Sequence, residues 1–526
     1  MSFRPVNYSN PVNSGSDTIR VRFAPSPTGP LHIGGVRTAL YNYLFARKMG
    51  GKMLLRIEDT DQNRFVPGAE EYIIDALRWV GIEIDEGQGV GGPHGPYRQS
   101  ERRDIYQKEA QRLVDEGKAY YAFDTAEELD VMRQRLEDAN APAAQYNAIT
   151  RMQMRNSLTL KVDEVRARMD AGEPYVIRLK TPRKEEVRLN DLIRGWVNVH
   201  SSAIDDKVLL KSDGLPTYHL ANIVDDHLME ITHVIRGEEW LPSAPLHVLL
   251  YRYLGWEDTM PQFAHLPLLL KPEGNGKLST RDADLGGFPI FPLQWTDPAT
   301  GIIAKGFREE GYLPEATINF LALLGWNPGT EQELFTMDEL IASFDLTQVH
   351  KAGARFDIQK AQWFNHQYIR LRPDAELGPA VQQPAEAAGF DCPPAKAEKI
   401  VSLLKGRVNF AREIFAEAGT IFNAPTTYDE TTAAAKWNAE AVRAVAAFRD
   451  ALREFTGDFV ADAIKQTLSD AMMQAGIKPG KIMQAMRLAL TGSGTGPDLM
   501  LTMEIIGKEE TVARLETALS TLNVPA

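Results

Sequence analysis

The sequence predicts an α/β protein with an open parallel sheet, interrupted by an inserted α+β module and followed by an all-helical C-terminal region. Apolar residues alternate over 19–23, prolines and glycines fill 25–30, and helical spacing begins at Gly34. A second strand–helix–strand pattern covers 208–235. From about residue 300 the chain becomes alanine-rich with helical spacing, broken by Pro and Gly.

The stretch 18–40, TIRVRFAPSPTGPLHIGGVRTAL, organises the first half of the chain. A strand over Ile19–Phe23 passes through a proline-rich loop into a helix whose first turn contains Gly34 and Gly35. A helix N-terminus presents unpaired N–H groups and a partial positive charge, and His32 adds a donor beside it. This pattern indicates a phosphate site, although a histidine beside two glycines is more often structural. The GxxxxGK[ST] and GxGxxG phosphate-binding fingerprints are both absent here.

Composition limits the class of protein. The chain has 526 residues, 44% hydrophobic and 25% charged, which predicts several domains. The single cysteine, Cys392, excludes an internal disulfide and a zinc site built of thiolates. The net charge of −13 argues weakly against RNA binding, because nucleic-acid binders usually carry a basic surface. Residues 1–17 resemble no targeting segment and no apolar run could span a bilayer, so we expect a cytoplasmic protein.

Further elements follow along the chain. A strand over Met53–Ile57 leads to Glu58, Asp59 and Asp61, and an amphipathic helix covers Ala69–Val80. A basic-leaning helix begins near Ser100, residues 126–172 have helical spacing, and strands are predicted over 176–180 and 192–200.

The second half of the predicted core starts with a strand at Val208. Tyr218 and Asn222 lie four residues apart on one face of the helix that follows, and the next strand ends at Arg236. Such residues suit a carboxylate, because arginine binds carboxylates bidentately and stays charged. Taken singly, each of these side chains is more often a core aromatic or a surface ion pair.

Three motifs carry a resemblance to a known family. PSPTGPLHIGG (25–35) resembles the HIGH signature of class I aminoacyl-tRNA synthetases, with Gly35 where the signature has its second His. RFA (22–24) and RIEDTD (56–61) resemble the bacterial-type glutamyl-tRNA synthetases. KLSTR (277–281) resembles the family's KMSKS loop, with Thr280 at the second lysine.

The resemblance implies a Rossmann-type catalytic core split by an acceptor-stem-binding insertion and followed by a helical anticodon-binding region. The ranges expected are a tail (1–17), the first core half (18–99), the insertion (100–215), the second core half (216–272), the KMSKS loop with a stem-contact domain (273–372) and the helical region (373–526).

The resemblance also implies a reaction, ATP-dependent ligation of L-glutamate to tRNA(Glu), with Mg²⁺ accompanying ATP. Residues implied to bind glutamate are Arg22, Ala24, Ser26, Glu58, Tyr218, Asn222 and Arg236. ATP would contact His32, Gly34, Gly35, Lys277 and Thr280, and His32, Lys277 and Arg281 would be catalytic. Basic residues that could contact tRNA are Lys405, Arg407, Lys478 and Lys481.

Some relatives hold zinc in the insertion, but residues 118–125 (KAYYAFDT) lack a ligand set, so we expect neither zinc nor another protein-bound metal. We expect a monomer. Four alternatives remain open from the sequence: an enzyme that also charges tRNA(Gln), a glutaminyl-tRNA synthetase, a nucleotidyltransferase that makes small cofactors, and a non-catalytic tRNA-binding protein. The short relative that modifies a tRNA base lacks the long C-terminal region found here.

Overall fold

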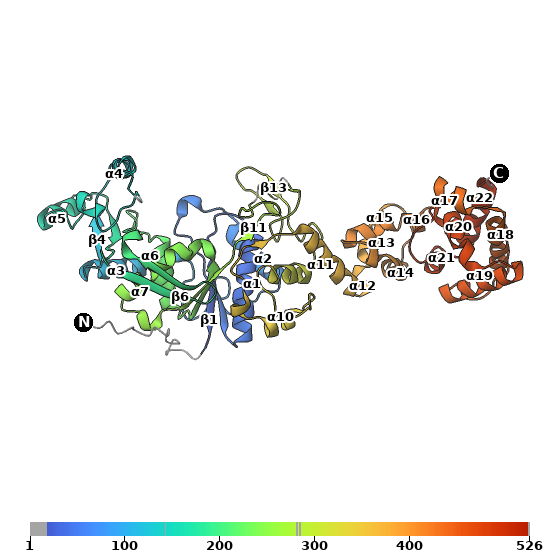
Figure 1. The fold of residues 1–526 in the computed structure, drawn as a ribbon, viewed down its shortest axis with the longest axis horizontal. Coiled ribbons are helices and arrows are strands. Elements are labelled where there is room, and N and C mark those ends of the chain that lie inside the picture. Colours follow the sequence, from blue (N-terminus) through green and yellow to red (C-terminus); the bar gives the residue numbers. More distant parts are fainter. Residues whose placement is uncertain (1–17, 142–143, 280–281, 283–285, 524–526) are drawn as a thin grey trace. The chain divides into compact units, whose positions relative to one another are not determined.

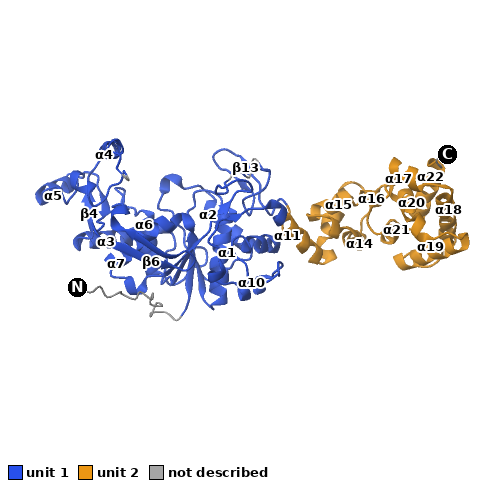
Figure 2. Ribbon diagram, in the orientation of Figure 1, with its two compact units in different colours: residues 1–310, 314–361 blue, residues 311–313, 362–526 orange. Residues whose placement is uncertain are grey.

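The structure is a computed structural model that describes residues 18–141, 144–279, 282 and 286–523. The chain divides into two compact units (Figure 2). The first comprises 1–310 and 314–361, and the second comprises 311–313 and 362–526. The helical region predicted from residue 373 thus belongs to the second unit, whose long segment begins at Gln362. The predicted tail 1–17 lies outside the described residues.

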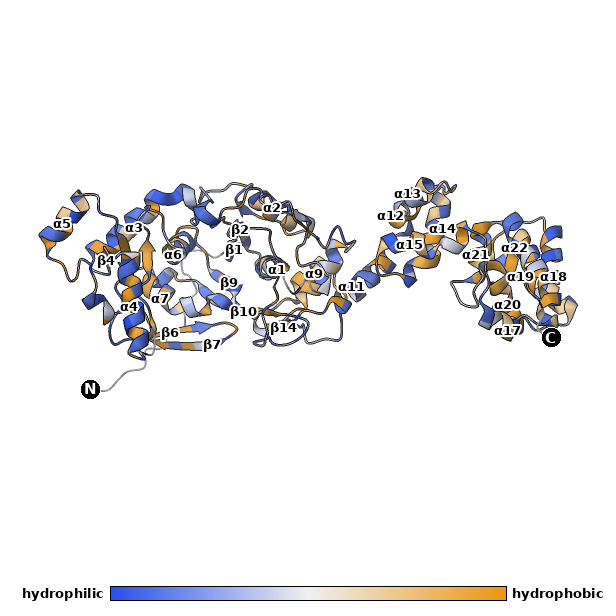
Figure 3. Ribbon diagram, turned by 90° about the horizontal axis from the view of Figure 1, so that it is seen from above, coloured by the Kyte–Doolittle hydropathy of each residue, from blue (hydrophilic) through white to orange (hydrophobic). Residues whose placement is uncertain are grey.

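Parallel strands form the centre of the first unit (Figure 1). β1 (Arg20–Phe23), β2 (Lys52–Leu55) and β3 (Glu86–Gly87) are parallel, and β9 (His233–Gly237), β10 (Gln262–Leu266) and β6 (Glu186–Asp191) pair in parallel as well. The Thr232 N–H donates to the Arg20 carbonyl at 2.9 Å, which brings β9 beside β1. β2, β1, β9 and β10 lie in succession in Figure 3, as expected for one open parallel sheet.

Amphipathic helices pack against these strands. α2 (Ala69–Trp79) buries Tyr72, Ile73, Ala76 and Leu77, the spacing of one helix face. In Figure 3, α1 (Ile33–Lys48) and α2 lie on one side of the strands, and α3 (Arg103–Asp115), α6 (Tyr218–Leu228) and α7 (Ala244–Tyr253) lie on the other. Side chains of α3, α6 and α7 share one buried apolar cluster with Val234 of β9 and Phe263 of β10.

The predicted insertion contains its own antiparallel sheet of β4 (Ala119–Ala122), β5 (Val176–Leu179) and β8 (Val208–Leu210). α4 (Ala126–Asp138) and α5 (Val162–Asp170) belong to the same part of the unit (Figure 1). The strand at 208–210 was described with the second half of the core, although it falls within the range 100–215 predicted for the insertion. β8 pairs with β5, so only its description as a core strand was wrong. The hairpin of β6 and β7 (Gly195–His200) lies within the range predicted for the insertion, yet β6 pairs with core strand β10.

Short elements complete the first unit. β11 (Leu269–Leu270) pairs with β14 (Ala354–Arg355), and β12 (Trp295–Thr296) pairs with β13 (Ile303–Ala304). α9 (Pro314–Ala322) packs on α1, where the Tyr41 hydroxyl donates to the Ala322 carbonyl at 2.9 Å. α10 (Met337–Ser343) also contacts α1.

The second unit is helical throughout its described residues, as predicted. Its helices are α11 (Ile358–Leu371, which begins in the first unit), α12 (Asp374–Leu377), α13 (Pro379–Ala387), α14 (Pro394–Leu404), α15 (Ile414–Glu417), α16 (Gly419–Phe422), α17 (Glu430–Lys436), α18 (Ala439–Glu454), α19 (Ala461–Ala475), α20 (Pro479–Thr491), α21 (Leu499–Ile506) and α22 (Lys508–Thr521). Two apolar clusters stabilise it, one centred on α13 and α14 and one on α18–α20. Across the described part of the chain, every helix is too short or too polar to cross a bilayer.

Candidate active site

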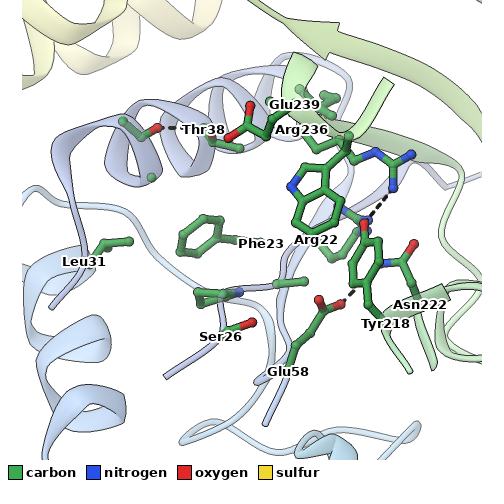
Figure 4. Close-up of a pocket in the computed structure, with 17 residues that line it drawn as sticks. Arg22, Phe23, Ser26, Leu31, Thr38, Glu58, Tyr218, Asn222, Arg236 and Glu239 are labelled. Atoms are coloured by element: carbon green, nitrogen blue, oxygen red, sulfur yellow. Dashed lines mark hydrogen bonds between the residues drawn. The ribbon is translucent and has the colours of Figure 1, made fainter. Parts of the chain in front are cut away.

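A cavity of about 270 Å³ opens where β1 and β9 end and α1 begins (Figure 4). The carboxyl edge of a parallel sheet is where ligands bind in open α/β folds. Residues far apart in the sequence meet there. All seven residues predicted to bind glutamate line it, together with both glycines of the first helical turn: Arg22, Ala24, Ser26, Gly34, Gly35, Glu58, Tyr218, Asn222 and Arg236.

Arg236, at the end of β9, is buried and held by three neutral groups. Its Nη1 donates to the Tyr218 hydroxyl at 2.8 Å, and its Nε donates to His265 Nε2 at 3.0 Å. Its Nη2 lies 3.3 Å from His247 Nδ1. The guanidinium therefore brings a positive charge to the cavity wall.

Arg22 is also buried in the cavity wall, but it already has a counter-charge. Its Nε and Nη2 donate to the two oxygens of Asp226 at 3.0 and 3.3 Å. The Arg56 Nη1 donates to the same carboxylate at 2.8 Å, and together the two guanidinium groups hold the pKa of Asp226 below its usual range despite burial. Arg22, Asp226 and Arg56 thus form a hydrogen-bonded cluster of charged groups behind the cavity.

Glu58 supplies negative charge at the opposite wall. Its Oε1 accepts from Arg56 Nη2 at 3.0 Å and from Asn222 Nδ2 at 3.2 Å. Burial raises the pKa of Glu58, and the charges of Arg56 and Arg22 oppose that shift. A bound ammonium group would favour the ionised form further.

Tyr218 forms one side of the cavity. Its ring stacks on Trp240 with centroids 4.1 Å apart, so the aromatic pair is held in one orientation. Burial raises the pKa of the Tyr218 phenol, which therefore stays protonated and can donate a hydrogen bond to a ligand.

Comparisons with known proteins agree with this geometry. Residues 18–363 match the family model of the tRNA synthetases class I (E and Q), catalytic domain, and residues 376–519 match an anticodon binding domain. The chain belongs to the class I tRNA synthetases of the E and Q group. The glutamate–tRNA ligase of Cytophaga hutchinsonii is 66% identical over 511 residues, which cover 97% of this chain and 99% of that one. The enzyme of the same name from Porphyromonas gingivalis is 58% identical over 96% of this chain and 99% of its own length.

A solved structure is similar over the same span. The crystal structure of a glutamate tRNA ligase from Elizabethkingia meningosepticum, in complex with its amino acid, superposes with a TM-score of 0.89 at 50% identity. The superposition covers 96% of this chain and 100% of the solved chain.

The first turn of α1 in this class I tRNA synthetase differs from the expectation of free N–H groups. The Gly34 N–H donates to His32 Nδ1 at 3.0 Å, and the Gly35 N–H donates to the His32 carbonyl at 2.8 Å. The Ile33 N–H donates to the Ile290 carbonyl at 2.9 Å. The prediction was wrong on this point because His32 is itself the N-cap, and its ring nitrogen takes the place of a capping oxygen.

His32 retains one unused group. Because Nδ1 accepts from Gly34, a neutral ring carries its proton on Nε2, and Nε2 is buried without a hydrogen-bond partner in the described structure. Burial and the nearby charge of Lys277 lower the pKa of His32 to about 4. His32 does not line the cavity, although the flanking Leu31 and Gly34 do.

Lys277 is exposed, and its Nζ lies 3.1 Å from Oε1 of Glu239, a residue of the cavity wall. It forms an antiparallel β-bridge with Leu270, and the next residue, Leu278, donates its N–H to the Leu269 carbonyl at 2.8 Å. Thr280 and Arg281, the other two residues predicted in this loop, lie outside the described residues.

The four residues predicted to contact tRNA lie in the second unit with different surroundings. Lys405 Nζ pairs with Asp374 at 2.8 Å and donates to the Arg372 carbonyl. Arg407, Lys478 and Lys481 have exposed side chains.

Sequence reasoning missed several residues that shape the cavity. Trp240 and Glu239 follow Arg236 within the run HVIRGEEWL, but no periodicity marks them as wall residues. Arg56 and Asp226 had no predicted binding role. Each comes shortly after an apolar run, and a charged side chain is rarely buried there unless it is paired with an opposite charge. Among the described residues, no three His, Cys, Asp or Glu side chains gather as a metal site.

Proposed function

We propose that this chain ligates L-glutamate to the 3′ end of tRNA(Glu) through a glutamyl-adenylate. The observation that carries the proposal is the cavity in which two buried arginines, Glu58 and Tyr218 meet at the N-terminus of α1. Relatives that are 56–66% identical over nearly their full length bear the name glutamate–tRNA ligase.

The cavity offers complementary groups for each charged part of glutamate. Glu58 receives the α-ammonium group, since Arg56 and Asn222 both donate to its Oε1 and leave its Oε2 for a ligand. Arg236, assisted by the Tyr218 hydroxyl, takes a carboxylate, and Arg22 adds positive potential from behind. Ala24 and Ser26 close the β1 side of the cavity.

ATP is proposed to bind beside the first turn of α1, where Gly34 and Gly35 permit close approach. His32 Nε2 and the Lys277 ammonium would stabilise charge on the transferring phosphoryl group, and Thr280 and Arg281 would extend that contact from the loop. Phosphoryl transfer depends chiefly on such positioning and electrostatic stabilisation. Magnesium would arrive with the triphosphate, since the described residues present no cluster of their own to hold it.

The reaction has two steps. An oxygen of the α-carboxylate attacks the α-phosphorus of ATP and pyrophosphate leaves, which forms the mixed anhydride. A ribose hydroxyl of the terminal adenosine of tRNA then attacks the anhydride carbonyl and AMP leaves. The insertion would contact the acceptor end of the tRNA. The helical unit would contact the anticodon region through residues such as Arg407, Lys405, Lys478 and Lys481.

Charging assays test the proposal. The purified chain should esterify tRNA(Glu) with labelled glutamate in the presence of ATP and Mg²⁺, and should reject glutamine. Charging of tRNA(Gln) with glutamate would identify the wider specificity, and charging of tRNA(Gln) with glutamine would contradict the proposal. Light scattering of the same sample tests whether the chain is a monomer.

A further inference from the structure

The buried arginines of the cavity differ in their partners. Arg22 and Arg56 are neutralised by Asp226, and Arg56 also pairs with Glu58. Arg236 contacts two imidazoles and a phenol, and no carboxylate of the described residues forms an ion pair with it. A buried charge without a counter-charge is costly, so this site gains most when an anion binds.

The hydrogen bonds around Arg236 determine the tautomer of His265. A guanidinium can only donate, so His265 Nε2, at 3.0 Å from Arg236 Nε, must accept. The ring proton therefore sits on Nδ1, which lies 2.6 Å from Asp191 Oδ2. Both His265 and Asp191 are fully buried.

Asp191 is itself held in one orientation. Its Oδ1 accepts from the Ile193 N–H at 3.0 Å and from the Arg194 N–H at 2.8 Å, in the turn after β6. Its other oxygen is left for His265. The carboxylate therefore reaches Arg236 only through one imidazole ring, which keeps it from forming a direct ion pair.

His247 completes the arrangement on the other side. Its Nδ1 faces Arg236 Nη2 at 3.3 Å, and its Nε2 lies 3.3 Å from His219 Nδ1. Burial and the charge of Arg236 lower the pKa of His247 well below its usual value, so the ring stays neutral and can accept.

We infer that Asp191 and His265 are positioning residues: through the His265 tautomer they fix the orientation of Arg236 while leaving its charge available for a substrate carboxylate. This inference rests on the proposed function. With the side-chain carboxylate of glutamate on Arg236, it explains discrimination against glutamine, because a neutral amide cannot supply the missing counter-charge.

Asp191→Asn tests the inference directly. The asparagine oxygen can keep the bonds to Ile193 and Arg194, but its NH₂ group then faces His265 Nδ1 and forces the ring proton onto Nε2, against the Arg236 donor. We expect KM for glutamate to rise by about tenfold or more, since a bond to a charged group is weakened. KM for ATP and kcat should change by less than about threefold, and the preference for glutamate over glutamine should fall.

A second pair of variants keeps the test decisive if Asp191→Asn does not fold. Gln at 265 can place an oxygen near the position of Nε2, whereas Leu offers no acceptor to Arg236. His265→Gln should therefore retain most of the affinity for glutamate that His265→Leu loses. His227→Gln is the control for replacing a packed histidine by glutamine, because His227 contacts Thr259 and Trp256 and forms no hydrogen bond with Arg236 in the described structure.

Two results would overturn the inference. One is an unchanged KM for glutamate in Asp191→Asn and His265→Leu. The other is a parallel loss of kcat and of affinity for both ATP and glutamate, which indicates a merely structural role. Failure of the wild-type chain to charge tRNA(Glu) would instead refute the proposed function, so the two failures are distinguishable.

Discussion

His32 has two ring nitrogens with separate tasks. Nδ1 caps α1 by accepting from the Gly34 N–H, and Nε2 is buried without a partner in the described structure. The cap stabilises the helix whatever the protein binds, whereas a buried donor left unpaired costs free energy until a ligand accepts from it. A single alanine substitution would remove both functions together.

Two substitutions separate these tasks. Asn caps helices well through its side-chain oxygen but cannot reach as far as Nε2, so His32→Asn should keep the cap and lose the donor. We expect ATP–pyrophosphate exchange, measured with glutamate and tRNA, to fall by roughly 10²-fold in both His32→Asn and His32→Ala. Only His32→Ala should also lose stability, by about 1 kcal/mol in thermal unfolding. Exchange at the wild-type rate in His32→Asn would remove Nε2 from the mechanism.

Gly35 illustrates what sequence can and cannot reveal about a residue. Its place in the HIGH-like motif suggests a contact with phosphate, yet the structure gives a steric reason for glycine. A Cβ at this position would lie 2.5 Å from Leu31 Cδ1, in the wall of the cavity. Local pattern identifies the position, but only the packing of the preceding loop reveals this constraint.

Strand β8 shows the corresponding limit for an element. A short apolar run at 208–210 predicts a strand correctly, but its partner depends on contacts far away in the sequence. β8 pairs with β5 in the insertion, and β6 leaves the insertion to pair with β10. Periodicity contains no information about pairing, so the sequence predicts the strands of the core individually but not the boundary between core and insertion.

A buried carboxylate holds the sheet of the insertion together. Asp206, fully buried, accepts from the Tyr120 hydroxyl at 2.6 Å, from Arg151 Nη1 at 3.0 Å and from the Thr181 N–H at 3.0 Å. These donors come from β4, from the segment before α5 and from the segment after β5. One side chain therefore links three segments, and helix and strand propensities alone would not indicate that these segments pack together.

Asp206→Asn should weaken this sheet. The substitution leaves the buried Arg151 without its counter-charge, which costs about 3–5 kcal/mol. Hydrogen exchange of residues 119–122 and 176–179 should accelerate in the variant. Asp205→Asn is the neighbouring control, since the partly exposed Asp205–Lys207 pair contributes under about 1 kcal/mol. Equal exchange rates in the two variants would contradict the role given to Asp206.

For the molecule as a whole, the negative net charge alone would not suggest a protein that acts on RNA. The chain carries a net charge of −13, yet its family acts on tRNA. Composition argues weakly against RNA, and the motifs around His32 and Arg236 outweigh it, because a substrate cavity depends on a few placed groups and not on net charge. A protein of this charge must bind phosphates through local basic groups.

The four basic residues of the second unit differ in how available their charges are for contact with phosphate. Lys478 and Lys481 are exposed, whereas Lys405 already pairs with Asp374 at 2.8 Å. Replacing Lys478 and Lys481 together by Ala should raise KM for tRNA while leaving KM for glutamate unchanged. The slope of log affinity against log salt should become shallower by roughly one for each phosphate interaction that the substitutions remove. Lys405→Ala should alter the slope little, because that ammonium would first have to leave Asp374. An unchanged slope in the double variant, or an equal effect of Lys405→Ala, would exclude this ranking and assign tRNA binding to other residues of the chain.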